Sequence, residues 1–219
     1  MKIYLIGDST LQYNNIKTYP QMGWGQVLHL YVEPQIEICN HAKNGTSSKS
    51  FFETGLFEPV AESMTSGDLL LIQFGHNDQK EDEARKTDAH TTYKIFLTHY
   101  IEVARSKGAI PILITPLCRR HFKEGALKVG IHLDFPEAMI ELSKALEVPL
   151  IDLYVESRQR IEYYGEEDSK ALYLHLSPKQ YERAPEGLED NSHLSMKGAV
   201  EFAGIIANGL KRIGYDFVI

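Results

Sequence analysis

Cysteine is scarce in this sequence of 219 residues. The two cysteines, Cys39 and Cys118, are far apart, and neither belongs to a CxxC or a Cys/His pattern. Structural zinc sites and disulfide frameworks need cysteines at characteristic spacings. The sequence supports neither, so we expect two buried thiols and no bound metal.

A long hydrophobic segment is missing from the N-terminal region. The apolar run from Ile3 to Ile6 follows Met1 and Lys2 directly, and it is too short to cross a membrane or to act as a signal sequence. We therefore expect a cytoplasmic protein that does not associate with membranes. A chain from which a signal peptide had been removed would show the same pattern.

Clustered positive charge is also absent. The formal net charge is −7, and no run of Lys and Arg is longer than the pair Arg119 and Arg120. Surfaces that bind nucleic acids or anionic lipids are rich in clustered basic residues. The composition argues against both partners and favours a neutral or modest-sized substrate.

Several motifs that would indicate a cofactor or a different chemistry are missing. The segment GWGQVL (23–28) begins like a dinucleotide-binding loop but ends in Leu28 and does not directly follow a strand-like run. There is no Walker lysine pattern and no GxSxG nucleophile motif. A phosphatase that used Asp8 as its nucleophile would need a second acid two positions later, where Thr10 stands. No cofactor is therefore expected.

Strand-like apolar runs alternate along the chain with longer stretches of helical period, as in parallel sheets built from βαβ units. We predict an α/β fold with one domain over residues 1–219, arranged as a three-layer α/β/α sandwich around a five-stranded parallel sheet. The expected strands are residues 2–6, 35–39, 68–74, 109–114 and 149–151.

Two of the expected helices have a clear apolar face. The first ends at Gly108, and the last begins after Ser195 as its N-cap and stops at Gly214. The apolar face of the first consists of Tyr93, Phe96, Leu97, Tyr100, Ile101 and Ala104.

Polar turns follow the first three strands: GDST (7–10), NGTSS (44–48) and GHND (75–78). In open parallel sheets the ligand lies outside the carboxyl ends of the strands, so we expect these turns to meet at one edge. Ser9 in the first turn could be a nucleophile there, or it could simply cap a following helix.

A serine nucleophile needs a base, and His193 in DNSH is the best placed of the nine histidines. Asp190, three residues earlier, could hold the imidazole through Nδ1 while Nε2 faces the serine. The alternative is that DNSHLS is only a polar turn that leads to the Ser195 cap.

The other two turns contain candidate donors for an oxyanion. Asn77 offers a side-chain amide, and Gly45 offers a backbone N–H with no Cβ in the way. Both residue types are also common in tight turns. The arrival of four polar turns at one edge favours a shared active site over four unrelated turns.

Together, these blocks resemble the four marked positions of the SGNH (GDSL-like) hydrolases over nearly the whole chain. The resemblance implies a flavodoxin-like SGNH hydrolase fold with Ser9 as nucleophile, His193 as base and Asp190 as its orienting partner. It also implies an oxyanion hole made of the N–H groups of Ser9 and Gly45 and the side chain of Asn77.

Within that superfamily the sequence is most similar to the rhamnogalacturonan acetylesterases. The features that carry this similarity are GDST in place of GDSL, GWG at 23–25, the Arg119–Arg120 pair, LHLSPKQY at 174–181 and DNSHLSMKGA at 190–199. We therefore predict a serine carboxylic-ester hydrolase of pectin degradation, which removes acetyl groups from rhamnogalacturonan-type oligosaccharides in the cytoplasm.

Three residues are candidates for substrate binding. Arg119 and Arg120 could bind a galacturonate carboxylate, or they could tie down their loop through surface ion pairs. Trp24 could line a sugar subsite or pack under the active-site loop.

Other functions remain open. One is an acetylesterase for other sugars, such as xylo-oligosaccharides, and another is a non-catalytic sugar-binding protein with the same fold. An esterase or thioesterase for acyl chains would need a long apolar groove, whereas the loops around 115–133 and 165–190 are charged and polar.

Overall fold

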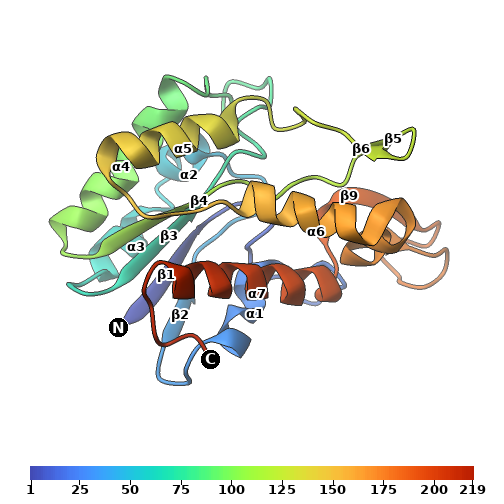
Figure 1. The fold of residues 1–219 in the computed structure, drawn as a ribbon, viewed down its shortest axis with the longest axis horizontal. Coiled ribbons are helices and arrows are strands. Elements are labelled where there is room, and N and C mark those ends of the chain that lie inside the picture. Colours follow the sequence, from blue (N-terminus) through green and yellow to red (C-terminus); the bar gives the residue numbers. More distant parts are fainter.

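The computed structural model describes residues 1–219 and has a five-stranded parallel sheet at its centre (Figure 1). The strand order is β2–β1–β3–β4–β7, and every neighbouring pair is parallel. The strands are β1 (Lys2–Gly7), β2 (Glu37–Asn40), β3 (Leu69–Gln73), β4 (Ile110–Ile114) and β7 (Leu150–Ile151). The five expected strands and the parallel sheet are confirmed.

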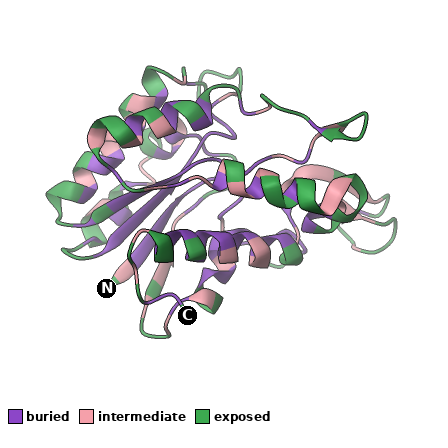
Figure 2. Cartoon of the chain, in the orientation of Figure 1, coloured by how far each residue is buried: buried purple, intermediate pink, exposed green.

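Helices cover both faces of this sheet, which explains why its central strands are apolar along their whole length. One face packs against α1 (Trp24–Val27), α6 (Leu153–Asp168) and α7 (Met196–Arg212). The other packs against α2 (Ser48–Glu53), α3 (Glu58–Ser63), α4 (Thr92–Ser106) and α5 (Phe135–Leu146). Figure 2 shows the resulting three layers, with the strands buried and the outer sides of the helices exposed. The predicted α/β/α sandwich is confirmed.

Alternate residues of each strand belong to different cores. In β1, Ile3 and Leu5 pack with the α7 side, whereas Tyr4 and Ile6 pack with the α4 side. This separation follows from the period of two in side-chain direction along a strand. It fixes the register of the sheet and therefore the position at which each strand ends.

The two helices expected from their apolar faces are α4 and α7. The Ser195 side chain accepts a hydrogen bond of 3.2 Å from the Gly198 N–H, as expected for an N-cap. Gly214 adopts a φ of 101° just after α7 and closes the helix through a hydrogen bond to the Lys211 carbonyl.

Two small antiparallel strand pairs lie outside the main sheet. The strands β5 (Phe122–Lys123) and β6 (Ala126–Leu127) form a hairpin that projects from the body in Figure 1. The strands β8 (Tyr173–Leu176) and β9 (Leu188–Leu194) form the second pair. Two short 3₁₀ helices, η1 (Leu28–Tyr31) and η2 (Ser169–Leu172), complete the elements.

Two details differ from the sequence-based expectations. The segment DNSH lies within β9 and not in a simple turn, because β9 pairs with β8 around an irregularity that leaves only Asn191, Ser192 and His193 unpaired. Cys118 is buried as expected, but Cys39 is only half-buried because it lies on the edge strand β2.

None of the helices has both the length and the apolar character needed to cross a membrane.

Candidate active site

The strand order brings the polar turns together. It corresponds to the doubly wound order 2-1-3-4-5, in which the direction of winding reverses between β1 and β3. The crevice at the carboxyl ends of these two strands is the place where such sheets bind ligands. The turn with Ser9 follows β1, and the turn with Asn77 follows β3.

Ser9 lies in a tight turn that no helix follows, because the next helix, α1, begins only at Trp24. The helix-cap alternative for Ser9 is therefore wrong. The Asp8 side chain holds the turn by accepting hydrogen bonds from the Thr10 N–H (2.9 Å) and the Thr10 hydroxyl (2.8 Å). Ser9 itself is 8% exposed, and its hydroxyl makes no hydrogen bond to another protein group.

A chain of buried hydrogen bonds supports this turn from below. The Trp24 indole N–H donates to Gln73 Oε1 (3.0 Å), and Gln73 Nε2 donates to the Thr10 hydroxyl (2.6 Å). Trp24 is completely buried, so it packs under the turn that holds Ser9 and is not available to line a sugar subsite. The prediction that Trp24 binds substrate is thus corrected.

Asp190 and His193 form a directly bonded pair. His193 Nδ1 lies 2.7 Å from Asp190 Oδ2, and Asp190 Oδ1 accepts from the backbone N–H groups of Ser192 (2.8 Å) and His193 (2.9 Å). Although partial burial alone would raise the pKa of Asp190, the hydrogen bonds and charge of His193 lower it to about 2. The ionised carboxylate assigns the imidazole proton to Nδ1 and leaves the Nε2 lone pair free to accept a proton.

The irregular pairing of β8 with β9 explains how the Asp190–His193 pair is positioned at the site. Leu174 pairs with Asp190, but its neighbour Tyr173 pairs with Leu194, so the three residues between Asp190 and Leu194 bulge out of the ladder. Bulges of this kind redirect side chains at functional sites. The bulge contains His193, and the Asp190 side chain closes it through the two backbone hydrogen bonds described above.

Two further backbone hydrogen bonds fix the bulge on the site. The Met22 N–H donates to the Leu194 carbonyl (3.1 Å), and the Arg120 N–H donates to the Asn191 carbonyl (2.9 Å). Two residues after Met22, the Trp24 N–H donates to the Thr10 carbonyl (2.8 Å), so the chain that holds Leu194 is also bonded to the turn that contains Ser9. The bulge with His193 is thereby held near that turn, although no hydrogen bond joins His193 Nε2 to the Ser9 hydroxyl in this structure.

The two candidate oxyanion donors lie next to each other. Asn77 Nδ2 donates to the Thr46 carbonyl (3.0 Å), which places the amide against the turn that contains Gly45. Gly45 is exposed and adopts a φ of 80°, and no atom lies within 4 Å of the place a Cβ would occupy. The N–H groups of Gly45 and Ser9 donate to no protein acceptor, so both are free to bind a ligand oxygen.

Asp78 connects the two donor turns, and sequence reasoning gave it no role. Its carboxylate accepts from the Ser48 N–H and from the Gly75 N–H (both 3.0 Å), and also from the hydroxyls of Ser48 and Thr87. Burial raises the pKa of Asp78 to about 7, while the hydrogen bonds from Ser48 and Thr87 act in the opposite direction. In the sequence, an acid directly after Asn77 was an indication of this role. The partners of Asp78, however, include Ser48 and Thr87, which lie in segments that are distant along the chain.

Arg120 has a structural role. It is 4% exposed, and its guanidinium donates to Ser169 Oγ (2.9 Å), to Asn191 Oδ1 (2.7 Å) and to the Glu166 carbonyl. These bonds hold the bulge of β9 against η2. The prediction that Arg120 binds a substrate carboxylate is therefore corrected, because its donors already have internal partners.

Arg119 is half-buried and bonds to the turn that contains Asn77. Its Nη2 donates to the His76 carbonyl (2.9 Å), and its Nε faces His76 Nδ1 at 3.4 Å. Burial and the Arg119 charge lower the pKa of His76 to about 3, so this imidazole stays neutral and donates from Nε2 to the Leu117 carbonyl. Arg119 thus remains a candidate for substrate binding.

No group of three or more His, Cys, Asp or Glu side chains is placed to hold a metal ion. A surface hollow of about 570 Å³ includes none of the predicted site residues. It lies along α7 and is lined by residues such as Tyr31, Met196 and Glu201.

Comparisons with known proteins agree with this geometry. Residues 5–183 match the GDSL-like Lipase/Acylhydrolase family. The chain is 41% identical over 214 residues to the rhamnogalacturonan acetylesterase RhgT of Bacillus subtilis (strain 168), covering 98% of this chain and 91% of RhgT.

Two solved structures share the fold. YxiM from Bacillus subtilis superposes with a TM-score of 0.82 at 26% identity, covering 99% of this chain, which spans 57% of the YxiM chain. The acetylxylan esterase Axe2 from Geobacillus stearothermophilus gives a TM-score of 0.67 at 17% identity, covering 100% of this chain and 96% of Axe2, and shares the fold alone. On the family match and the near full-length identity to RhgT, this chain belongs to the GDSL-like lipase/acylhydrolase family.

Proposed function

We propose that this protein is a carbohydrate esterase that removes O-acetyl groups from rhamnogalacturonan-type oligosaccharides through an acyl-enzyme on Ser9. The observation that carries this proposal is the Asp190–His193 pair, bonded at 2.7 Å and held near the Ser9 turn by backbone hydrogen bonds. A protein that only bound sugars would have no use for a base presented in this way. The proposal is for an enzyme and not for a sugar-binding protein.

The first half of the reaction forms the acyl-enzyme. Ser9 Oγ attacks the acetyl carbonyl carbon while its proton passes to His193 Nε2, and Asp190 stabilises the imidazolium that results. The tetrahedral intermediate then collapses, and His193 returns the proton to the departing sugar oxygen. The sugar leaves as an alcohol, and the acetyl group stays on Ser9.

The second half frees the enzyme. Water attacks the acetyl-Ser9 ester as His193 takes its proton, and collapse returns that proton to Ser9 Oγ and releases acetate. In both halves the developing oxyanion receives hydrogen bonds from the N–H groups of Ser9 and Gly45 and from the Asn77 amide. The free N–H groups of Ser9 and Gly45 support this role, because no protein acceptor competes for them.

The role of Asn77 can be tested by Asn77→Ala. Loss of one well-placed oxyanion donor lowers kcat by about 10² to 10³, because the interaction is made mainly in the transition state. We therefore expect a large fall in kcat on p-nitrophenyl acetate with little change in KM. The matched control is Asn44→Ala, which alters an exposed residue of the neighbouring turn. An effect on KM alone would show that Asn77 binds substrate without stabilising the transition state.

The substrate proposal is supported by the similarity to RhgT and by the position of Arg119. A galacturonate carboxylate matches the fork of a guanidinium, and Arg119 is partly exposed, although it bonds to His76 and its Nη groups lie within hydrogen-bond distance of the Gln79 amide. We also propose that the enzyme acts in the cytoplasm on oligosaccharides already cut from the polymer. The alternative of acetylated xylo-oligosaccharides has the fold shared with Axe2 in its favour.

Acetate release from different acetylated substrates tests this proposal. We expect faster release from acetylated rhamnogalacturonan oligomers than from acetylated xylo-oligomers or short acyl-thioesters. The Arg119→Ala variant should lose the preference for uronate-containing oligomers by about tenfold or more, because a charge-assisted pair contributes about 1.5–3 kcal/mol. A preference for xylan would support the alternative substrate, and an unchanged preference in Arg119→Ala would remove the arginine from substrate binding.

A further inference from the structure

One segment of the chain, residues 12–22, runs along the mouth of the candidate site and is fixed at both ends. At its start, the Gln12 side chain accepts a hydrogen bond from the Asn44 N–H, next to Gly45. At its end, the Met22 N–H donates to the Leu194 carbonyl, next to His193. The segment therefore extends from the oxyanion turn to the base, and we call it the rim segment.

Internal hydrogen bonds make the rim segment a defined surface. Buried Asn14 donates from its backbone to Gln26 Oε1 (3.0 Å) and accepts from the Thr18 hydroxyl (3.1 Å). The carbonyl of Thr18 accepts from the Gln21 N–H (2.9 Å). Side chains on such a segment are presented in fixed directions, which lowers the entropy lost when a ligand binds.

The rim segment exposes large apolar side chains in an otherwise polar region. Tyr13 is 65% exposed, Ile16 is 84% exposed and Tyr19 is 51% exposed. The Tyr19 ring meets the edge of Tyr181, from the loop between β8 and β9, with the ring centroids 5.6 Å apart. Several exposed apolar side chains on one short segment next to a catalytic group indicate a binding surface.

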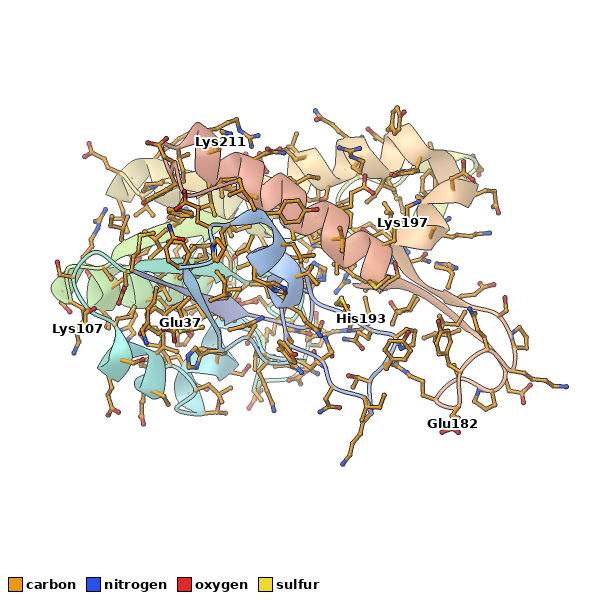
Figure 3. All side chains as sticks on the ribbon, turned by 90° about the horizontal axis from the view of Figure 1, so that it is seen from below. Glu37, Lys107, Glu182, His193, Lys197 and Lys211 are labelled. Carbon is orange, nitrogen blue, oxygen red and sulfur yellow. The ribbon has the colours of Figure 1, made fainter.

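Two cations accompany the tyrosines. Lys17 is exposed in the middle of the rim segment, and Arg183 reaches from the β8–β9 loop to donate to the Thr18 carbonyl. Neither forms an ion pair with an acidic side chain. In Figure 3 the neighbouring acid, Glu182, lies at the outer end of the same loop, well away from His193.

This combination fits one class of ligand. A sugar ring has a face of C–H groups that packs well on a flat aromatic ring, while the tyrosine hydroxyl can bond to sugar hydroxyls. A uronic acid adds a carboxylate, for which Lys17 and Arg183 are suitable partners. The exposed tyrosine rings and the cations without an acidic partner would suit an oligosaccharide in which neutral sugars and uronic acids alternate.

We propose that the rim segment, together with Tyr181 and Arg183, binds the uronate-containing sugars that flank the acetylated residue. This proposal rests on the proposed function, because it assumes that the acetylated sugar lies over Ser9. Tyr13 and Tyr19 provide the ring faces, and Lys17 and Arg183 bind the carboxylates. The enzyme would then select chains of several sugars over acetylated monosaccharides.

The test uses a Tyr13→Ala, Tyr19→Ala double variant and a Lys17→Gln, Arg183→Gln double variant. We expect each to lower kcat/KM on long acetylated rhamnogalacturonan oligosaccharides by about tenfold, mainly through KM. The loss should be smaller on short oligosaccharides and absent on p-nitrophenyl acetate, which is too small to reach the rim. The Tyr13→Phe, Tyr19→Phe variant should restore most of the loss, because it keeps both ring faces.

The control is Tyr163→Ala, which removes an even more exposed tyrosine from the surface of α6 and should change nothing. Direct binding of the same oligosaccharides to a Ser9→Ala background, measured by calorimetry, should weaken with the rim variants in the same order. Equal kinetics and binding for rim variants and parent would overturn this proposal alone. A wild type without esterase activity on any acetyl ester would instead overturn the proposed function.

Discussion

Replacing Ser9 with alanine is expected to abolish the esterase activity, with kcat on p-nitrophenyl acetate falling by about 10⁵- to 10⁶-fold. The reason is that the acyl-enzyme cannot form without the Ser9 oxygen, and His193 then has no nucleophile to activate. The oxyanion donors remain in Ser9→Ala, because the N–H of residue 9 belongs to the backbone. Any residual activity should therefore come from direct attack by water in an otherwise intact site.

The fold of Ser9→Ala should be unaffected. The Ser9 hydroxyl makes no hydrogen bond within the protein, whereas the turn is held by Asp8, Thr10 and Gln73. We expect the free energy of unfolding in urea to change by less than about 1 kcal/mol. The matched control is Ser177→Ala, an exposed serine of the β8–β9 loop whose hydroxyl is also unbonded. Turnover near that of the wild type, or loss of wild-type activity on adding a chelator, would contradict the mechanism.

The parts of the fold that could be predicted are those set by strong periodic patterns. The strands β1 and β3 are continuous apolar runs, and the faces of α4 and α7 repeat at helical spacing. Because parallel strands place their carboxyl ends at one edge, their succession was enough to bring Ser9, Gly45 and Asn77 together. This inference required only the order of the elements.

The position of His193 in a β-bulge could not be predicted in the same way. It depends on a short strand pair, β8 and β9, whose irregular pairing involves residues separated by a long loop. No local pattern in DNSH indicates a bulge, because the same letters suit a polar turn. The pairing becomes evident only when Leu174 is seen opposite Asp190 and Tyr173 opposite Leu194.

Burial of polar and amphipathic side chains was the other source of error. Trp24 and Arg120 are of types that commonly bind ligands, yet both are buried with internal partners that are distant in sequence. Trp24 bonds to Gln73, and Arg120 bonds to Asn191 and Ser169. Composition and spacing cannot reveal such partners, since each is brought near only by the packing of the whole chain.

Replacing Asp190 with asparagine should reduce kcat by about 10⁴-fold while leaving KM nearly unchanged. An asparagine amide at this position can donate to His193 Nδ1, which moves the imidazole proton to Nε2. Nε2, the nitrogen that takes the Ser9 proton in the proposed mechanism, is then already protonated and cannot accept it. Asparagine keeps an oxygen for the N–H groups of Ser192 and His193, so the bulge should survive, and kinetics on p-nitrophenyl acetate can separate chemistry from folding.

The same substitution should change the dependence of stability on pH. The pKa of Asp190 is about 2 in the folded protein, below the value of about 3.9 for an unfolded chain. The folded state therefore binds this proton less tightly, so the ionised group stabilises the fold above the unfolded pKa and loses that contribution as the pH falls toward 2. At a half-buried site, solvent screening limits the effect to about 1 kcal/mol.

Urea unfolding of wild type and Asp190→Asn between pH 6 and pH 2.5 would measure this difference. We expect the wild type to be more stable at pH 6 and the two proteins to converge as the pH falls below about 4, because protonation removes the same charge that the substitution removes. The control is Asp168→Asn, since the Asp168 side chain is exposed and makes no hydrogen bond, so it should show no such convergence. A stability difference that stayed constant across this range, together with unreduced kcat, would show that Asp190 neither carries the charge at His193 nor orients its ring.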